Sequence, residues 1–342
     1  MRVAILASIA WRTPPRNYGP WEQVASCLTE GLVTSGVQVT LFATSDSITN
    51  ARLDSASSVP YAENPEVDPK VAECLHISNL MEKADQFDII HNHFDFLPLT
   101  YSKLIHTPIV TTIHGFSSPK IKEVYRKYNV HTHYVAISNA DRDEDLDYVA
   151  TVYNGINRDE FPFVSDPDDY LLFFGRIHPD KGTREAVQIA LGSGRRLLIA
   201  GLIQDEAYFR QHVEPFVDSG QIFYCGNVGP DKRKRLLGMA YAMLHPIDFE
   251  EPFGLSVAES MFCGTPVIAF NRGAMCELIQ EGKTGFLVNS VAEAVEAVGF
   301  IEGIKREACT AWAQSMFSVD RMVQGYLDVY KTVLDQSPVI RD

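Results

Sequence analysis

The stretch His245-Pro-Ile-Asp-Phe-Glu-Glu-Pro-Phe-Gly-Leu-Ser-Val-Ala-Glu-Ser-Met261 decides the fold of this chain. The apolar residues that end at His245 predict a buried strand, and Phe253-Gly254-Leu255 predicts the start of a helix. A glycine at a helix start lets a phosphate approach bare backbone N–H groups, where the helix dipole favours negative charge. The stretch therefore predicts an anion-binding site between a strand and a helix.

Two carboxylates flank this predicted anion site. Glu251 precedes it, and Glu259 lies further along the helix. A carboxylate does not bind phosphate, but it accepts hydrogen bonds from sugar hydroxyls, such as those of a ribose. Acids on both sides of a phosphate site indicate a ligand with hydroxyl groups at both ends and phosphate between them. A nucleotide-sugar fits this description.

A pair of basic residues follows another predicted strand, Tyr170–Gly175. Arg176 and Lys181 lie one short loop apart, where the strand ends. The guanidinium supplies forked hydrogen-bond donors and the ammonium a point charge, so together they can clamp a diphosphate. The alternative is a helix start with exposed basic residues, and the glycines that flank the pair favour the diphosphate site.

Composition limits the class of protein. A chain of 342 residues predicts two domains, and 30 basic against 44 acidic residues argue against nucleic acid or an anionic membrane as the main partner. The six cysteines form no Cys-x-x-Cys pair, which predicts a reduced, cytoplasmic protein without a zinc site. The segment Arg2–Ser8 is expected to be a first strand rather than a signal peptide, and no apolar run reaches the roughly 18 residues of a membrane span.

The amino-terminal half predicts a strand, a polar loop, a helix and a second strand. The loop Trp11–Gly19 falls at the carboxyl end of a parallel strand, where α/β proteins bind ligands. Trp11, Arg12 and Arg16 in this loop suggest an acceptor that carries phosphate or carboxylate. Residues 45–69 are predicted to be a loop, and Ser138–Asp141 the cap of a short acidic helix.

Three histidines end two predicted strands of this half. His91 and His93 alternate as a metal pair would, but no third ligand is evident, so polar strand ends facing a ligand are favoured. His114 is followed by Gly115 and is well placed to point toward a ligand, the alternative being a core histidine. A basic helix follows, and we expect its lysines and arginine to form a solvated face rather than a membrane-docking surface: Lys120, Lys122, Arg126 and Lys127.

The spacing Glu251-x7-Glu259 around Pro-Phe-Gly-Leu, with Gly-Arg-x4-Lys-Gly at 175–182, resembles the retaining glycosyltransferases of family 4. The resemblance covers essentially the whole chain. It implies the GT-B fold, in which two Rossmann-like α/β domains face each other across a cleft. Residues 1–157 would form the acceptor-side domain and 158–318 the nucleotide-sugar domain, with a helix at about 319–342 returning to the first domain. The family usually has Gly-Gly before an acidic residue, where this chain has Gly19-Pro20-Trp21-Glu22, which puts the contacts of that loop in doubt.

The resemblance also implies roles for individual residues. Arg176 and Lys181 would hold the pyrophosphate and stabilise the leaving group, Glu251 would bind the donor sugar's hydroxyls, and His114 the far side of that sugar. Glu259 would bind the ribose. Further donor contacts would come from Gly19, Gly226, Asn227, Phe253, Gly254 and Leu255.

The implied reaction moves a sugar from a nucleoside-diphosphate donor, most simply UDP- or GDP-linked, to an acceptor hydroxyl with retention of configuration. The two cations would replace a metal, and no cofactor is expected. The acceptor could be a small molecule, a lipid-linked sugar or a glycan. Two alternatives remain open: a nucleotide-sugar 2-epimerase of the same fold, and a catalytically silent nucleotide-sugar-binding protein.

Overall fold

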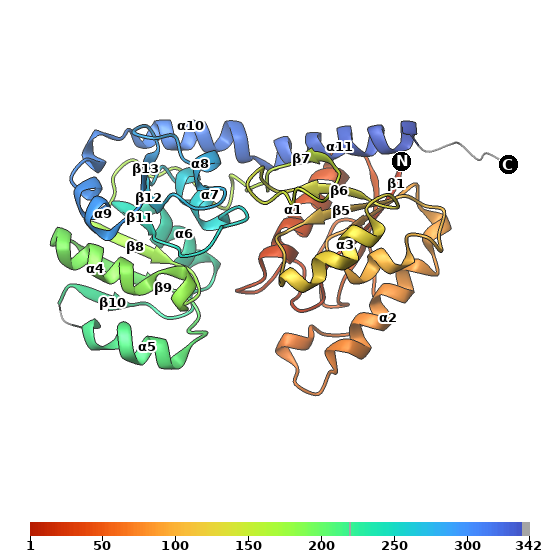
Figure 1. Ribbon diagram of the computed structural model, residues 1–342, viewed down its shortest axis with the longest axis horizontal. Helices are drawn as coiled ribbons and strands as arrows, with labels where there is room; N and C mark the ends of the chain where they lie inside the picture. Colours follow the sequence, from red (N-terminus) through yellow and green to blue (C-terminus); the bar gives the residue numbers. More distant parts are fainter. Residues whose placement is uncertain (219, 337–342) are drawn as a thin grey trace. The chain divides into compact units, whose positions relative to one another are not determined.

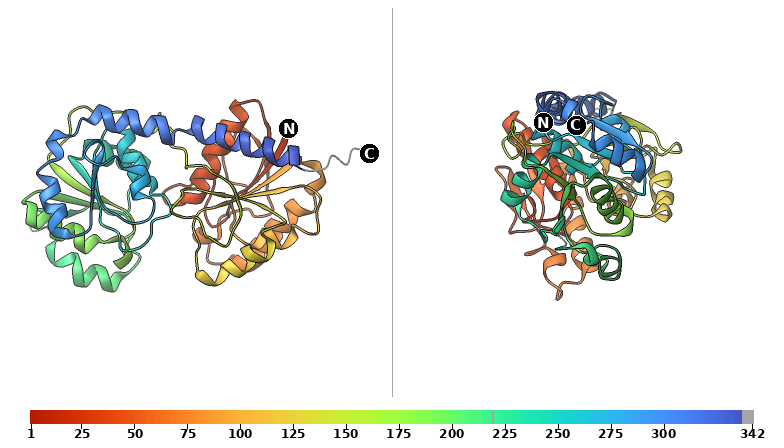
Figure 2. Two further views of the ribbon diagram at one scale, coloured as in Figure 1. Left: turned by 45° about the horizontal axis from the view of Figure 1, so that its top comes forward. Right: turned by 90° about the vertical axis from the view of Figure 1, so that its left-hand side faces the viewer.

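A computed structural model describes residues 1–218 and 220–336, which form two units. Unit 1 comprises residues 1–155 together with the C-terminal helix from Val319, and unit 2 comprises residues 156–318. Each unit is a parallel β-sheet with helices packed on its faces (Figures 1 and 2). This is the doubly wound architecture that the alternation of strands and helices predicts.

The sheet of unit 1 has the strand order β3-β2-β1-β4-β5-β6-β7, and every neighbouring pair is parallel. Val3 through Leu6 in β1 are fully buried, as a parallel strand covered on both faces requires. The strands are β1 (Arg2–Leu6), β2 (Gln38–Phe42), β3 (Arg52–Asp54), β4 (Ile89–Asn92), β5 (Ile109–Ile113), β6 (His133–Ala136) and β7 (Tyr148–Thr151). The helices are α1 (Pro20–Thr34), α2 (Pro69–Met81), α3 (Lys122–Tyr128) and α11 (Val319–Gln336).

Two local predictions in this unit are wrong. The predicted loop at 45–69 contains the short edge strand β3, which pairs with β2. Ser138 accepts a hydrogen bond from the Asp141 amide at 3.1 Å, as a helix cap would, but residues 139–147 form turns instead of a helix. The acidic side chains of this segment bind α3: Asp143 pairs with Lys122 and Asp145 with Arg126, each at 2.7 Å. Tertiary ion pairs therefore replace the local helix.

Helix α11 belongs to unit 1 because its tyrosines bond to the interior of the sheet. Tyr330 Oη lies 2.6 Å from Nδ1 of His91, and Tyr326 Oη lies 2.7 Å from Oγ1 of Thr112. His91 Nε2 also contacts Thr112 Oγ1 at 2.7 Å, so the four side chains form one buried network. Residues 337–342 of the predicted returning helix lie outside the described residues.

The sheet of unit 2 has the order β10-β9-β8-β11-β12-β13, again with parallel pairs throughout. The strands are β8 (Tyr170–Phe174), β9 (Arg196–Ala200), β10 (Ile222–Tyr224), β11 (Ala242–His245), β12 (Val267–Phe270) and β13 (Gly285–Val288). The helices are α4 (Thr183–Ser193), α5 (Glu206–His212), α6 (Pro230–Met239), α7 (Leu255–Phe262), α8 (Met275–Leu278), α9 (Val291–Val298) and α10 (Arg306–Phe317).

Each sheet has one point where its strand order reverses. In unit 1 this point lies between β1 and β4, and in unit 2 it lies between β8 and β11. At such a point the loops at the carboxyl ends of two adjacent strands run to opposite faces of the sheet, and the space between them is where α/β proteins bind ligands. Arg176 and Lys181 follow β8, and Glu251 follows β11, so the predicted site residues of unit 2 lie on both sides of its reversal point.

The bond between Tyr330 and His91 predicts a specific stability effect. Tyr330→Phe removes the hydroxyl and leaves Nδ1 of a fully buried histidine without a partner. We expect the free energy of unfolding to fall by about 1–3 kcal/mol, measured by urea denaturation. Lys331→Ala, an exposed change on the same helix, is the control and should be neutral. Equal stability of Tyr330→Phe and the wild type would contradict this account of how α11 is held.

Candidate active site

Lys181 and Glu251 form an ion pair across the reversal point of unit 2. Lys181 Nζ lies 2.7 Å from Oε2 of Glu251, and the two side chains are only 15% and 13% exposed. The loops that carry them touch, since the Asp248 amide donates to the Asp180 carbonyl at 2.8 Å. Gly182 has φ 72°, and a Cβ there would lie 1.8 Å from the Pro246 carbonyl oxygen. Only glycine allows the two loops to approach this closely.

Glu251 is a stabilised carboxylate. Burial alone would raise its pKa, but the hydrogen bond with His245 and the charge of Lys181 outweigh burial and lower the pKa to about 2. His245 Nε2 lies 3.4 Å from the same Oε2 atom. The ring of Phe249 lies beneath Lys181, with the ammonium 4.4 Å from its centroid. At neutral pH this carboxylate is therefore an acceptor only.

The turn at Gly273 and Ala274, after β12, holds the Glu251 backbone in place. The Ala274 amide donates to the Glu251 carbonyl at 2.9 Å, and the Gly273 amide donates to the Glu250 carboxylate. Gly273 has φ 54°, and a Cβ there would lie 2.4 Å from both N and O of Glu251. The turn after β12 thus fixes the position of the carboxylate.

Arg176 lies on the same β8 loop as Lys181 but has other partners. Its guanidinium donates to the side-chain carbonyl of Gln204 and lies 3.9 Å from the Asp180 carboxylate. Asp180 in turn contacts Nδ1 of His178 at 2.6 Å. The Arg176 side chain is 26% exposed, so part of it is accessible to a ligand.

Glu259 is paired with an arginine that the sequence did not single out. Arg233 of α6 donates to Oε1 of Glu259, while Oε2 makes no hydrogen bond to the described residues. Burial raises the pKa of Glu259, and the charge of Arg233 offsets part of that rise. The Arg233 guanidinium lies 5.5 Å and 5.4 Å from the ring centroids of Phe161 and Phe174. The carboxylate keeps one oxygen unpaired.

The amino-terminal end of α7 has the expected geometry for an anion. Gly254 has φ 96°, and the amides of Leu255 and Ser256 make no hydrogen bond to the described residues. The Phe253 side chain is buried edge-on against Phe317, with centroids 5.7 Å apart. The ring therefore fixes the turn that precedes the helix.

The predicted donor contacts Gly226 and Asn227 lie after β10, beside the loop that follows β9. The Gly201 amide donates to the Gly226 carbonyl at 3.0 Å, and Gly226 has φ 80°. A Cβ on Gly201 would lie 1.8 Å from the Gly175 carbonyl oxygen, so this loop packs directly against the end of β8. Asn227 is exposed next to them.

In unit 1, His114 follows β5 and has two ring neighbours. His93 Nδ1 lies 2.9 Å from Nε2 of His114, and the indole of Trp21 stacks on His114 with centroids 5.6 Å apart. Gly19, the residue before α1, has φ 151°, and a Cβ there would lie 2.8 Å from Pro15 Cβ. The structure thus places Gly19 in the β1–α1 turn, on the same helix start as Trp21.

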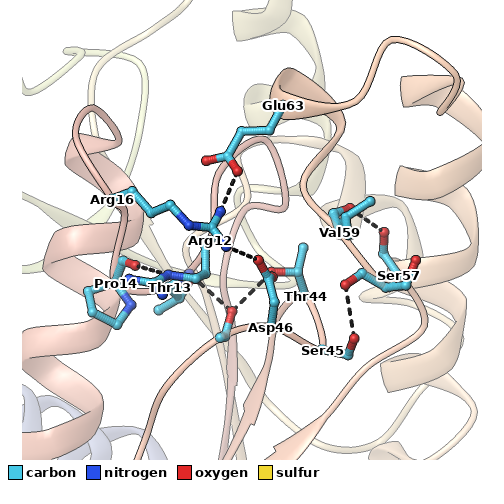
Figure 3. A network of polar contacts seen from close by, with 12 residues as sticks. Arg12, Thr13, Pro14, Arg16, Thr44, Ser45, Asp46, Ser57, Val59 and Glu63 are labelled. Atoms are coloured by element: carbon cyan, nitrogen blue, oxygen red, sulfur yellow. Dashed lines mark hydrogen bonds and ion pairs between the residues drawn. The ribbon is translucent and has the colours of Figure 1, made fainter. Parts of the chain in front are cut away.

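The predicted acceptor residues are held by contacts within their own loop region (Figure 3). Arg16 pairs with Asp46 at 2.9 Å and with Glu63, and Arg12 Nε donates to the Pro14 carbonyl at 2.9 Å. The Trp11 amide donates to Glu22. The positive charge of Arg16 is therefore compensated within the unit.

The basic helix α3 is likewise paired with the acidic segment that follows β6, as described above for Lys122 and Arg126. Within residues 1–218 and 220–336, no helix combines the length and apolar character needed to cross a bilayer. In the same residues, no group of three His, Cys, Asp or Glu side chains could hold a metal ion.

Four residues of the site were not predicted from the sequence: Gln204, Arg233, His245 and Phe249. His245 and Phe249 lie inside the quoted stretch, where their polar or aromatic character beside Glu251 was a usable signal. Arg233 is one of four consecutive basic residues, 232–235, and only the packing of α6 shows which one faces Glu259. Nothing in the sequence marks Gln204.

Comparison with known protein families identifies the family of this chain. The glycosyl transferases group 1 family matches residues 157–311, and glycosyltransferase family 4 matches residues 22–160. The chain belongs to the family 4 (group 1) glycosyltransferases. The family assignment confirms the resemblance drawn from the two glutamates and the two basic residues, and with it the GT-B fold.

The individual relatives have low sequence identity to this chain, and the share of the chain that they cover differs. An uncharacterized glycosyltransferase of Methanocaldococcus jannaschii is 25% identical over 96% of this chain and 98% of its own length. A GDP-mannose:cellobiosyl-diphosphopolyprenol alpha-mannosyltransferase of Komagataeibacter xylinus is 28% identical over 59% of this chain and 58% of its own. A solved structure of similar fold, the HepE protein of Anabaena in complex with UDP, superposes with a TM-score of 0.73 at 17% identity, over 97% of this chain and all of its own.

The buried histidines of unit 1 predict a loss of stability in mild acid. Burial lowers the pKa of His76 to about 4 and that of His114 to about 3, from an unfolded value near 6.5. The unfolded chain therefore binds more protons below pH 6.5, so the free energy of unfolding falls as pH falls through this window. For His76 alone we expect a loss of about 2 kcal/mol at pH 5 relative to pH 7.5.

Urea titrations at the two pH values measure this loss. His76→Leu removes one titrating ring and should show a smaller pH dependence than the wild type, whatever its stability at pH 7.5. Identical pH dependence in the two proteins would show that His76 is not a source of the acid sensitivity.

Proposed function

We propose that this protein transfers a glycosyl group from a nucleoside-diphosphate sugar to an acceptor hydroxyl, with retention of anomeric configuration and without a metal ion. The observation that carries the proposal is the buried Lys181–Glu251 pair at the reversal point of unit 2, which lies close to the first amides of α7. A cation, a fixed carboxylate and a helix start together match a diphosphate flanked by hydroxyl groups.

The diphosphate is the leaving group in this mechanism. As the bond from the anomeric carbon to the diphosphate oxygen breaks, its electron pair passes to that oxygen and the sugar gains oxocarbenium character. Lys181, Arg176 and the amides of Leu255 and Ser256 stabilise the growing negative charge, which is usually the largest catalytic contribution. The acceptor oxygen bonds to the anomeric carbon on the same face. Its proton passes to the departing phosphate oxygen, so no protein base is required.

The two carboxylates recognise hydroxyl groups at opposite ends of the donor. Glu251 is ionised and accepts hydrogen bonds from the sugar, while sharing Lys181 with the diphosphate. Glu259 keeps Oε2 unpaired, which suits a ribose hydroxyl. A UDP- or GDP-linked donor is the simplest expectation, since relatives include a protein solved with UDP and an enzyme named for GDP-mannose. No further cofactor enters the mechanism.

The acceptor belongs to unit 1 in this proposal, near Trp11, Arg12 and Arg16. A small molecule, a lipid-linked sugar or a glycan would each supply a hydroxyl. An acidic acceptor would compete with Asp46 and Glu63 for Arg16. This intramolecular pairing favours an uncharged hydroxyl-bearing acceptor over one that carries phosphate or carboxylate.

Lys181→Ala tests the leaving-group role. Removing a charge that faces the growing negative charge should lower the turnover number more than it raises the Michaelis constant for the donor. The measurement is release of nucleoside diphosphate from UDP- and GDP-sugars in excess chelator, with and without candidate acceptors. An effect on the Michaelis constant alone would reduce Lys181 to a binding residue, and rescue of wild-type activity by magnesium or manganese would refute metal independence.

A matched control is required because Lys181→Ala also leaves the charge of Glu251 buried without its partner cation. Lys181→Ala combined with Glu251→Gln relieves that charge. Glu251→Gln alone is the reference, because it also alters a sugar contact. If the double variant matches Glu251→Gln in turnover, the defect of Lys181→Ala came from the unpaired carboxylate; if it is slower, the lysine itself stabilises the leaving group. Return of an epimerised donor without transfer would instead identify the 2-epimerase alternative, and donor binding without turnover in the wild type would indicate the silent binding protein.

Glu259→Ala tests the nucleotide site separately from the chemistry. If Oε2 accepts a ribose hydroxyl, the variant should bind free nucleoside diphosphate more weakly by about 1.5–3 kcal/mol. Isothermal titration calorimetry measures this, and Glu296→Ala, an exposed glutamate of α9 in the same unit, is the neutral control. Unchanged affinity in Glu259→Ala would remove this carboxylate from the nucleotide site.

A further inference from the structure

His93 and His114 form a hydrogen-bonded pair at the ends of β4 and β5. Nδ1 of His93 lies 2.9 Å from Nε2 of His114, and His93 is fully buried. Burial lowers the pKa of both rings, so each is neutral and carries one ring hydrogen at neutral pH. One of the two facing nitrogens must therefore donate and the other accept.

The neighbours of the pair leave it no other hydrogen-bond partner. The ring of His91 lies 4.2 Å from that of His93, but its two nitrogens are already used by Tyr330 and Thr112. Nε2 of His93 is buried without a hydrogen bond to the described residues. Nδ1 of His114 makes no hydrogen bond to the described residues either, yet unlike Nε2 of His93 it is not enclosed.

Two arrangements of the hydrogens are possible, and they differ in what is left buried. If His114 donates, His93 must carry its own hydrogen on Nε2, which leaves an N–H donor buried and unpaired. If His93 donates from Nδ1, its Nε2 is a buried lone pair without a hydrogen bond to the described residues. Orphaned buried N–H groups are the rarer and costlier outcome, so donation from His93 is favoured.

We propose that His93 is a positioning residue that donates its Nδ1–H to Nε2 of His114, so that His114 holds its hydrogen on the accessible Nδ1. Trp21, stacked on the His114 ring at an interplanar angle of 21°, fixes the plane in which that N–H points. His114 then presents a neutral hydrogen-bond donor at the carboxyl edge of the unit 1 sheet. An oxygen of a bound sugar is the partner that suits it.

This arrangement also excludes a role for His114. With Nε2 accepting from His93 and Nδ1 carrying the hydrogen, the ring has no free lone pair with which to take a proton from an acceptor. It recognises an oxygen and cannot act as a general base. The choice of a sugar as ligand rests on the proposed function, whereas the position of the hydrogen does not.

Nuclear magnetic resonance of the full chain, labelled with nitrogen-15 at histidine, tests the hydrogen position. Two-bond correlations distinguish the tautomers, and loss of one set of signals in His114→Gln assigns the ring. We expect the Nδ1–H form of His114 in the wild type at pH 7.5. In His93→Asn the side-chain amide retains an N–H near the Nδ1 position, so the Nδ1–H form should persist. His93→Phe should shift His114 toward the Nε2–H form.

His76→Phe is the matched control, because His76 is also fully buried in unit 1 but bonds to the Ala7 carbonyl at 2.9 Å instead of to a ring. It should leave the His114 signals unchanged. For donor turnover, His93→Phe should cause a loss of about tenfold, and His93→Asn should restore most of it.

Wild-type His114 in the Nε2–H form, or the same tautomer in His93→Phe as in the wild type, would overturn the proposal. The expected tautomers in a protein that binds no nucleotide-sugar would uphold it and instead refute the proposed function.

Discussion

The ion pair between Lys181 and Glu251 is the interaction on which the site of unit 2 depends. It joins the loops after β8 and β11, the two strands between which the strand order of the sheet reverses. Two glycines make the pair possible, since a side chain at Gly182 would collide with the Pro246 carbonyl and one at Gly273 with the Glu251 backbone. A buried pair of this kind does little for stability compared with an apolar replacement, but loss of one partner costs about 3–5 kcal/mol. Its retention in a buried loop is therefore better explained by binding than by folding.

The side chains of this site are held by contacts within unit 2. Glu251 is held ionised by His245 and Lys181, and its backbone is fixed by the Ala274 amide. The amides of Leu255 and Ser256 make no hydrogen bond within the described part of the chain. A ligand that enters such a site orders few side chains, so little of its binding energy is lost to conformational entropy. The cost is that Lys181 must exchange part of its bond with Glu251 for the bond with an anion. In the proposed function, the strength of the internal pair would therefore limit the affinity for diphosphate.

Much of the fold and of the candidate site could be predicted from the sequence, because polar residues directly after buried strands converge at one edge of a parallel sheet. That rule predicted the positions of Arg176, Lys181 and Glu251 at the reversal point of unit 2 and of His114 after β5. It could not find partners set by packing. The contact between His93 and His114 depends on the register of β4 against β5, and the choice of Arg233 among four basic neighbours depends on how α6 packs. The predicted helix after Ser138 failed for a related reason, since its acidic residues bind α3.

The discontinuity of unit 1 has a consequence for biosynthesis. Tyr326 and Tyr330 lie on α11, which is translated after the whole of unit 2, while their partners Thr112 and His91 lie in the first half of the chain. Domains generally fold as units while the chain emerges from the ribosome. Unit 2 can therefore complete its core during synthesis, whereas in unit 1 His91 and Thr112 can bond to each other but must wait for their bonds to the hydroxyls of α11. The slowest unit to mature is the one that is made first.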